Sequence, residues 1–205
     1  MADVYILNCK ENASLLLNLL ENISPSRRER ANKMRKQESK LACIGSEVLL
    51  ASALGLTLPL ELGKAQNGKP YLDGEREFNI SHSGDYVICA VGKSPVGADI
   101  ERVGRVKEAV FGRIASPLEK EAAERLSPSE KEEYYCSVWT KKESLLKLTG
   151  EGIRKELSTV CTERAREHFF TQKLDNYLYT VCTAQCEQMR THFIAEETLR
   201  QSFNI

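Results

Sequence analysis

The amino-acid sequence predicts an α+β fold made of two similar subdomains in a pseudo-twofold arrangement, each with an antiparallel sheet packed against helices. Two observations support this prediction. Helical patterns are followed by short strands twice along the 205 residues, in halves of similar length, and 41% of the residues are hydrophobic, which is enough to fill a core. We expect one subdomain over residues 1–95 and the other over residues 96–205, although no literal repeat is visible.

A strand and two helices should open the first half. Residues 4–9 show the alternation of a short strand. Ser24 can cap a helix, and Pro25 fits the first turn because its missing N–H is not needed there. This helix should run to about residue 36. A second helix should run from about residue 38 to about residue 54, where Gly55 stops it.

Turns and strands should follow these helices. Asn67-Gly68 and Pro70 are turn signals and predict a loop over residues 63–72. Three strands are expected, separated by glycine-containing turns, over residues 77–81, 86–91 and 96–101.

Helices should dominate the start of the second half. After a helix near residues 105–114, Ser116 with Glu119 and Ser127 with Glu130 each form the pattern of a capping box. The longer of the following helices should cover residues 128–148 and end at Gly150 and Gly152. Three strand-like segments come between residues 168 and 195.

Composition excludes several classes of protein. The formal net charge is zero, so the chain as a whole should not attract nucleic acid. The longest apolar stretch, residues 41–56, contains Glu47 and is too short to span a membrane. No secretory signal is visible, and the seven cysteines include no CxxC pair, which favours reduced thiols in the cytoplasm.

Two acidic residues stand out on a predicted strand. Asp99 and Glu101 are two positions apart, so their side chains should leave the same face. Two carboxylates that close repel each other unless a cation lies between them, and an oxygen-only set suits Mg²⁺ better than Zn²⁺. The alternative is a solvated strand end, the usual meaning of an isolated pair of this kind.

A stripe on the long helix could complete such a site. Trp139, Glu143 and Lys147 are each four residues apart and share one helix face. Glu143 could supply a third carboxylate, and Lys147 could touch phosphate oxygens held by the metal. The alternative is an ordinary helical Glu–Lys pair, worth about 0.2–0.5 kcal/mol, beside a core tryptophan.

Other polar groups could bind phosphate. Ser81, His82 and Ser83 follow a predicted strand, where hydroxyls and backbone N–H groups can form an anion-binding nest. The alternative for His82 is a turn histidine with its hydrogen bonds satisfied. Arg27 and Arg30 share a helix face within a basic segment, which could grip a phosphate or simply be solvated.

Four motifs occur together in one order: GKP (68–70), FNISHS (78–83), VGADIE (96–101) and WTKKESLLK (139–147). Together they resemble the 4'-phosphopantetheinyl transferase superfamily. The chain length and the basic amino-terminal helix are similar to its monomeric, surfactin-synthetase-activating branch. The resemblance covers about residues 24–152 and weakens beyond them.

The resemblance implies an enzyme that transfers the 4'-phosphopantetheine group of coenzyme A to a serine of an apo acyl or peptidyl carrier protein. The reaction would depend on Mg²⁺ and release adenosine 3',5'-bisphosphate. It implies a monomer that binds coenzyme A in the cleft between its subdomains. Together with the composition, we expect a cytoplasmic protein with no nucleic-acid or membrane partner. A coenzyme-A-binding regulatory module without catalysis, or a Mg²⁺-dependent phosphohydrolase, is the alternative.

The resemblance also assigns roles to individual residues. The Mg²⁺ ligands would be Asp99, Glu101 and Glu143. Coenzyme A would be bound by Arg27, Arg30, Lys69, Ser81, His82 and Lys147, with His82 and the two arginines near the 3'-phosphate. Lys147 would contact the diphosphate and protonate the leaving phosphate. The base would be Glu143 or, as an alternative, Glu119, although a capping box alone explains Glu119.

The chain departs from the family pattern in two places. Ala42 and Cys43 stand where relatives often carry basic or hydroxyl residues, so phosphate contact there is in doubt. The region after Gly152 matches poorly, and we expect it to supply only the sheet of the second subdomain. The carrier protein would dock beside the cleft on Val106, Val110 and Phe111, unless these residues pack in the core.

Overall fold

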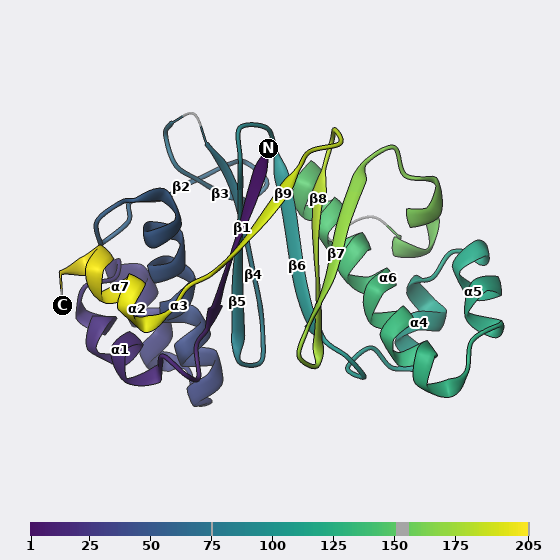
Figure 1. Ribbon diagram of the computed structural model, residues 1–205, viewed down its shortest axis with the longest axis horizontal. Helices are drawn as coiled ribbons and strands as arrows, with labels where there is room; N and C mark the ends of the chain where they lie inside the picture. Colours follow the sequence, from purple (N-terminus) through teal and green to yellow (C-terminus); the bar gives the residue numbers. More distant parts are fainter. Residues whose placement is uncertain (75, 151–155, 205) are drawn as a thin grey trace.

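The computed structural model describes residues 1–74, 76–150 and 156–204. From left to right, Figure 1 shows four layers: helices, a sheet, a second sheet and helices. The first sheet has the strand order β4-β5-β1-β9, and the second has the order β6-β8-β7. The predicted α+β class, with helices packed on largely antiparallel sheets, is confirmed.

The elements of the first half are β1 (Ala2–Asn8), α1 (Ala13–Asn18), α2 (Pro25–Lys33), α3 (Gln37–Leu54), β2 (Gly63–Lys64), β3 (Pro70–Tyr71), β4 (Glu77–Ser83) and β5 (Tyr86–Gly92). The predicted helices and strands of this half are present, and the predicted loop over residues 63–72 contains the two short strands β2 and β3. α3 ends as predicted, because Gly55 adopts the left-handed conformation (φ 66°) that glycine accepts without strain. The short helix α1, which buries Leu15 and Leu16, was not predicted.

The second half begins with the third predicted strand. Its elements are β6 (Val96–Arg102), α4 (Glu108–Ile114), α5 (Pro117–Glu124), α6 (Pro128–Thr149), β7 (His168–Leu174), β8 (Tyr177–Thr183), β9 (Met189–Phe193) and α7 (Glu196–Phe203). Short 3₁₀ turns lie at Leu19–Glu21, Leu157–Thr159 and Thr162–Arg164. Both predicted capping boxes are present, at the starts of α5 and α6. α6 ends at Gly150, and Gly152 lies outside the described residues.

The last strand does not belong to the second sheet. β9 pairs in parallel with β1, from Ala2 opposite Met189 to Ile6 opposite Phe193, and α7 then packs against α3. The expectation that everything after Gly152 supplies the second sheet is therefore wrong for β9, because β1 offers β9 a free edge. The division into subdomains at residues 95 and 96 stays a prediction. A boundary there assigns the paired strands β1 and β9 to different subdomains.

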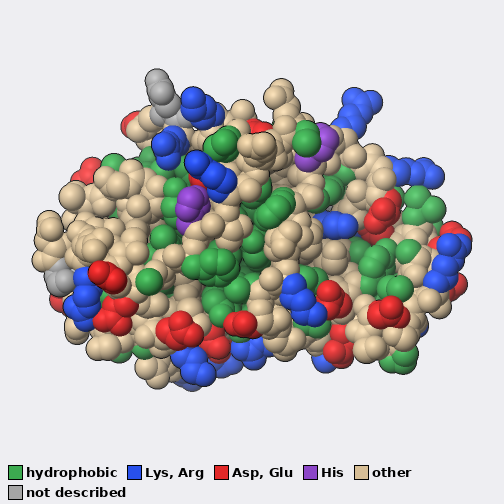
Figure 2. Space-filling view, in the orientation of Figure 1, with side chains coloured by type: hydrophobic (Ala, Val, Ile, Leu, Met, Phe, Trp, Pro, Cys, Tyr) green, Lys and Arg blue, Asp and Glu red, His purple; other side chains and the backbone are tan. Residues whose placement is uncertain are grey.

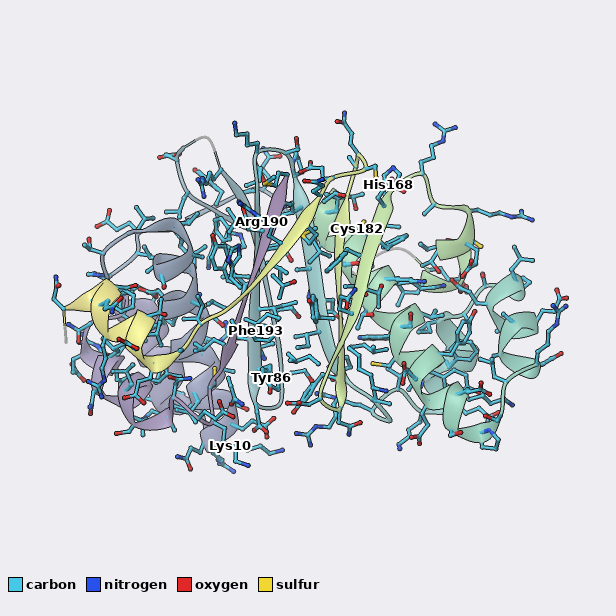
Figure 3. All side chains as sticks on the ribbon, in the orientation of Figure 1. Lys10, Tyr86, His168, Cys182, Arg190 and Phe193 are labelled. Atoms are coloured by element: carbon cyan, nitrogen blue, oxygen red, sulfur yellow. The ribbon has the colours of Figure 1, made fainter. Side chains whose placement is uncertain are left out.

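Hydrophobic residues form a layer between the two sheets. This core is built from alternate residues of the strands, including Val4 and Ile6 of β1 and Ala98 and Ile100 of β6. Figure 2 shows hydrophobic side chains along the middle of the visible face, where the sheets meet. At the lower end of the sheets, Tyr86 (Figure 3) donates a hydrogen bond to Asp175, which joins the halves again.

A close approach of α6 to β6 positions the candidate site. A Cβ atom at Gly97 would lie 1.9 Å from the Ser144 carbonyl oxygen, so only glycine allows this packing. Gly97, Asp99 and Glu101 alternate along β6 and share its α6-facing side. The two acids therefore lie beneath the helix. Among the helices of the described segments, none is long and apolar enough to cross a membrane.

Candidate functional site

The edge strands β4 and β6 lie side by side where the two sheets meet, and we call this line the seam. Asn79 Oδ1 accepts a hydrogen bond from the Ala98 N–H (3.0 Å), and Ser81 Oγ accepts one from the Ile100 N–H (3.4 Å). Side chains of β4 thus satisfy backbone donors on the free edge of β6. The candidate site is built along this seam, under α6.

Lys147 of α6 reaches Asp99 of β6. Its Nζ lies 2.6 Å from Asp99 Oδ1 and also donates to Ser81 Oγ and to the Ala98 carbonyl oxygen, both at 3.1 Å. Ser81 in turn donates to Asp99 Oδ1 at 2.7 Å. Side chains of α6 and β4 therefore converge on Asp99 of β6, a residue that is only 6% exposed.

Asp99 and Glu143 each keep a carboxylate oxygen without a partner. Asp99 Oδ2 and Glu143 Oε1 are buried, and no donor of the described residues lies within hydrogen-bonding distance. Burial raises the pKa of Asp99 against the lowering effect of Lys147, and nearby Glu101 adds to the rise. Burial, followed by the charge of Asp99, raises the pKa of Glu143. The pair accumulates negative charge that the protein only partly neutralises.

Glu101 has a different set of partners. Its Oε1 accepts hydrogen bonds from the Ser83 hydroxyl (2.5 Å) and the Arg102 N–H (2.9 Å), and Arg105 Nη1 lies 3.4 Å away. Ser83 is buried, whereas the Arg105 side chain is 66% exposed. Glu101 is therefore oriented mainly by contacts within the strands.

The three predicted metal ligands reach the same region without forming a ready coordination sphere. Within the described ranges 1–74, 76–150 and 156–204, no group of three or more His, Cys, Asp or Glu side chains is arranged to hold a metal ion. Asp99 is engaged by Lys147, and Glu101 is engaged by Ser83. The roles of Asp99, Glu101 and Glu143 as metal ligands stay a prediction.

The sequence motif around His82 lies within β4, not in a turn after it. Because side chains alternate, Ser81 and Ser83 face the carboxylates of β6, and His82 points to the other side of the strand. The surrounding protein desolvates the His82 ring and lowers its pKa, and the charges of Lys147, Arg30 and Arg27 lower it further. The predicted nest of loop N–H groups is replaced by a strand with two different faces.

Arg27 is anchored to the protein. Its Nε lies 3.2 Å from Glu47 Oε2, and its Nη1 donates to the Cys43 carbonyl oxygen at 3.1 Å. Glu47 is buried and also accepts hydrogen bonds from Ser24 and from the Leu60 N–H. Arg27 therefore compensates a buried carboxylate, a role that the sequence analysis did not foresee.

A cavity of about 600 Å³ lies beside these arginines. Residues that line it include Arg27, Arg30, Leu60, Lys64, Gly68 and Pro70. Lys69 borders a smaller neighbouring cavity, and its Nζ lies 3.9 Å from Glu77 Oε2. The hairpin of β2 and β3 then reaches α6, because Asn67 Nδ2 donates to the Gly150 carbonyl oxygen at 3.1 Å. Basic groups of the first half thus surround a hollow that the hairpin links to α6.

Glu119, the alternative base, is fully buried and fully engaged. It accepts hydrogen bonds from the Ser116 N–H, from Thr162 and from Lys142, whose Nζ lies 2.7 Å away. Burial alone would raise the pKa of Glu119, but these hydrogen bonds bring it below its ordinary value. A carboxylate without exposure or a free oxygen cannot meet a substrate hydroxyl, so we assign Glu119 a structural role.

Lys142 is a residue that the sequence analysis missed. Its Nζ donates to the carbonyl oxygens of Ile114, Leu157 and Val160 in addition to Glu119. It lies four residues after buried Val138 and directly before Glu143. Its place in the buried stripe of α6 was the signal that could have revealed it.

The predicted docking residues belong mainly to the core. Val106 and Phe111 are 5% and 4% exposed and form a cluster with Tyr135, and Val110 packs against it. Phe111 also stacks on Tyr135, with ring centroids 4.0 Å apart. The alternative that these residues pack internally is therefore the one that the structure supports.

Several known proteins are similar to this chain. The family model of the 4'-phosphopantetheinyl transferase superfamily matches residues 95–193. A 4'-phosphopantetheinyl transferase from Bacillus subtilis is 30% identical over 148 residues, which cover 69% of this chain and 66% of that protein. The 4'-phosphopantetheinyl transferase HetI from a Nostoc species is 32% identical over 171 residues, covering 75% and 72%.

The alignment covers a larger share of a third relative. The 4'-phosphopantetheinyl transferase AcpT from Escherichia coli is 28% identical over 170 residues, which cover 78% of this chain and 83% of that protein. By contrast, the chain spans about two thirds of the length of the Bacillus subtilis relatives, 66% of one and 64% of another. The family model covers β6 and α6, the elements that carry Asp99, Glu101, Glu143 and Lys147.

Proposed function

Because the chain belongs to the 4'-phosphopantetheinyl transferase superfamily, we propose that it transfers the 4'-phosphopantetheine group of coenzyme A to a serine of an apo carrier protein. The other product is adenosine 3',5'-bisphosphate. The observation that carries this proposal is the pair of buried, unpartnered oxygens, Asp99 Oδ2 and Glu143 Oε1, beside the Lys147 ammonium at the seam. Such a site suits a diphosphate with a counter-ion.

The donor set fits Mg²⁺. Mg²⁺ prefers carboxylate oxygens together with substrate phosphate oxygens and water, and the two free oxygens of Asp99 and Glu143 are donors of this kind. Asp99, Glu101 and Glu143 would hold the ion. When bound, Mg²⁺ supplies charge neutralisation for the diphosphate and its leaving group.

Basic groups around the cavity support a place for the nucleotide. Arg30 lines the cavity, and Arg27 borders it while paired with Glu47, so we assign Arg30 the larger share of 3'-phosphate binding. His82 contributes from the β4 face that lies near these arginines. Lys69 lies beside the nucleotide, and Ser81 contacts a phosphate group.

The reaction breaks the diphosphate P–O bond of coenzyme A and forms a P–O bond to the carrier serine. Glu143 accepts the proton of that serine, a role that suits a carboxylate whose pKa is raised by burial. Lys147 contacts the diphosphate and gives a proton to the leaving phosphate. Positioning and charge neutralisation are the main requirements of phosphoryl transfer, and the seam offers both.

An assay with coenzyme A, Mg²⁺ and a panel of apo acyl and peptidyl carrier proteins tests the proposal. We expect a mass gain of one phosphopantetheine group on a carrier serine. Glu143→Gln should lower the rate at least a hundredfold, because proton acceptance alone contributes about 10²–10⁴-fold. Glu132→Gln, on an exposed part of α6, is the control and should retain the rate.

Two results would contradict the proposal. Tight coenzyme A binding without mass gain on any carrier would favour the regulatory module. Near-wild-type turnover by Glu143→Gln would show that Glu143 is not the base.

We further propose a cytoplasmic monomer. The support for the compartment is that all seven cysteines are free thiols.

A further inference from the structure

Matching pairs of side chains line the two strands of the seam. β4 carries Ser81 and Ser83 two residues apart, and β6 carries Asp99 and Glu101 two residues apart. Ser81 donates to Asp99 Oδ1 at 2.7 Å, and Ser83 donates to Glu101 Oε1 at 2.5 Å. Each acid of the second half is therefore held by a hydroxyl of the first half.

Ser83 differs from Ser81 in its surroundings. Lys147 donates to both members of the Ser81–Asp99 contact, whereas Ser83 and Glu101 are joined by a direct hydrogen bond and have the Arg102 N–H and Arg105 as further neighbours. Ser83 is 3% exposed, and the Glu101 side chain is 14% exposed. A buried hydroxyl that donates to a carboxylate orients that carboxylate, because hydrogen bonds to a charged acceptor are short and strong.

Arg105 also contacts Glu101. Its guanidinium lies 3.4 Å from Glu101 Oε1 but is largely in solvent, where an ion pair of this kind contributes little. The Arg102 N–H, at 2.9 Å, shares Oε1 with Ser83. These contacts all engage Oε1, so Oε2 is the oxygen left outside them.

We propose that Ser83 is a positioning residue that holds Glu101 in the orientation required for binding a divalent cation together with Asp99 and Glu143. This inference rests on the proposed function, since it concerns the same cation. Groups that orient metal ligands typically change metal affinity by about 10–100-fold when they are removed. The metal site of the second half would then depend on a side chain from the first half.

Mn²⁺ binding to the full chain, measured by electron paramagnetic resonance with and without coenzyme A, provides the test. We expect Ser83→Ala to raise the Mn²⁺ dissociation constant about tenfold. Ser83→Thr keeps the hydroxyl and should restore binding. Ser46→Ala is the matched control: Ser46 is also buried, but its hydroxyl donates to the Ala42 carbonyl oxygen within α3.

A double-mutant cycle separates positioning from a general structural effect. If Ser83 acts through Glu101, Ser83→Ala will add no further loss of Mn²⁺ affinity in a Glu101→Gln background. Independent, multiplying losses would overturn the proposal. If Ser83→Ala does not fold, Ser83→Cys takes its place, because a thiol fills the site but is a weak donor.

The remaining outcomes distinguish this proposal from the proposed function. Wild-type Mn²⁺ affinity in Ser83→Ala, with weakened binding in Glu143→Gln, would overturn the role of Ser83 and leave the cation site in place. A wild-type chain that binds no Mn²⁺, even with coenzyme A, would overturn both the role of Ser83 and the metal chemistry. Transfer activity on a carrier would still stand as a separate result.

Discussion

Asp99 illustrates how one residue depends on a charge from another element. It sits on β6, nearly without exposure, and Lys147 of α6 supplies the ammonium that makes its charge tolerable. Desolvation of two ions is costly, so the pair adds little net stability, but the loss of one partner leaves an uncompensated charge. Asp99 is therefore sensitive to changes one helix away.

Lys147→Met should lower the free energy of unfolding by about 3 kcal/mol at pH 7 in the absence of Mg²⁺. This is the lower end of the range for removing one partner of a buried pair, because Lys147 still reaches solvent. The change should be measured by urea unfolding. Asp99→Asn/Lys147→Met should recover most of the loss, and two independent, additive losses would contradict the coupling.

The same variant should respond to pH in a defined direction. The pKa of Asp99 is raised in the folded chain, so between the unfolded and the folded pKa the folded chain binds more protons than the unfolded chain. Stability from this group is present at low pH and is lost as pH rises through the folded pKa. Lys147 lowers the pKa of Asp99, so its removal should raise that pKa further. The difference in the free energy of unfolding between wild type and Lys147→Met should therefore narrow as pH falls and Asp99 takes up a proton. A gap that widens toward acid would show that Asp99 is not the group left unpaired.

At the scale of elements, α6 connects two separate structures. Its Glu143 and Lys147 face the seam, and its Lys142 holds the carbonyl oxygens of two distant segments and the buried Glu119. These contacts fix the start of α5 and the 3₁₀ turns near residues 157–164 against the helix. α6 therefore carries the candidate chemistry on one face and organises the second half with another.

Lys142→Met should reduce the free energy of unfolding by about 3–5 kcal/mol, because Glu119 would remain buried without its cation. Lys141→Met, at a partly exposed neighbouring position of the same helix, is the control and should change stability by less than about 0.5 kcal/mol. Chemical unfolding followed by circular dichroism measures both. Equal losses in the two variants would contradict the role of the buried pair.

Local signals explain which elements and site residues could be predicted. The ends of α3 and α6 follow from glycine and capping residues, and strand alternation correctly places Asp99 and Glu101 on one face. The partner of β9 and the burial of Lys142 depend on contacts between residues far apart in the chain. No local pattern contains that information, and a charged residue in a helix normally indicates an exposed position.

At the scale of the whole molecule, the two sheets share one hydrophobic layer. Ile6 of β1 and Ile100 of β6 belong to the same buried cluster, although they come from different halves. The pairing of β9 with β1 adds backbone hydrogen bonds between the chain ends. Exposing the apolar inner face of either sheet to water costs free energy, so the halves should unfold together.

Ile6→Ala tests this cooperativity. It should lower the free energy of unfolding by about 2–5 kcal/mol, because it leaves a cavity between the sheets. Trp139, the only tryptophan, lies in the second half on α6 and reports on unfolding there. The fluorescence midpoint of Trp139 should shift as far as the circular dichroism midpoint. An unchanged fluorescence midpoint would show that the halves unfold independently.

The parallel contact between β1 and β9 also affects how the chain can fold during synthesis. Ala2 lies opposite Met189, so β1 is paired with a strand that is made almost 190 residues later. During translation, one edge of β1 stays unpaired until β9 has been synthesised. Completion of the first sheet is therefore postponed until residues 189–193 have been made, and such long-range pairing slows folding.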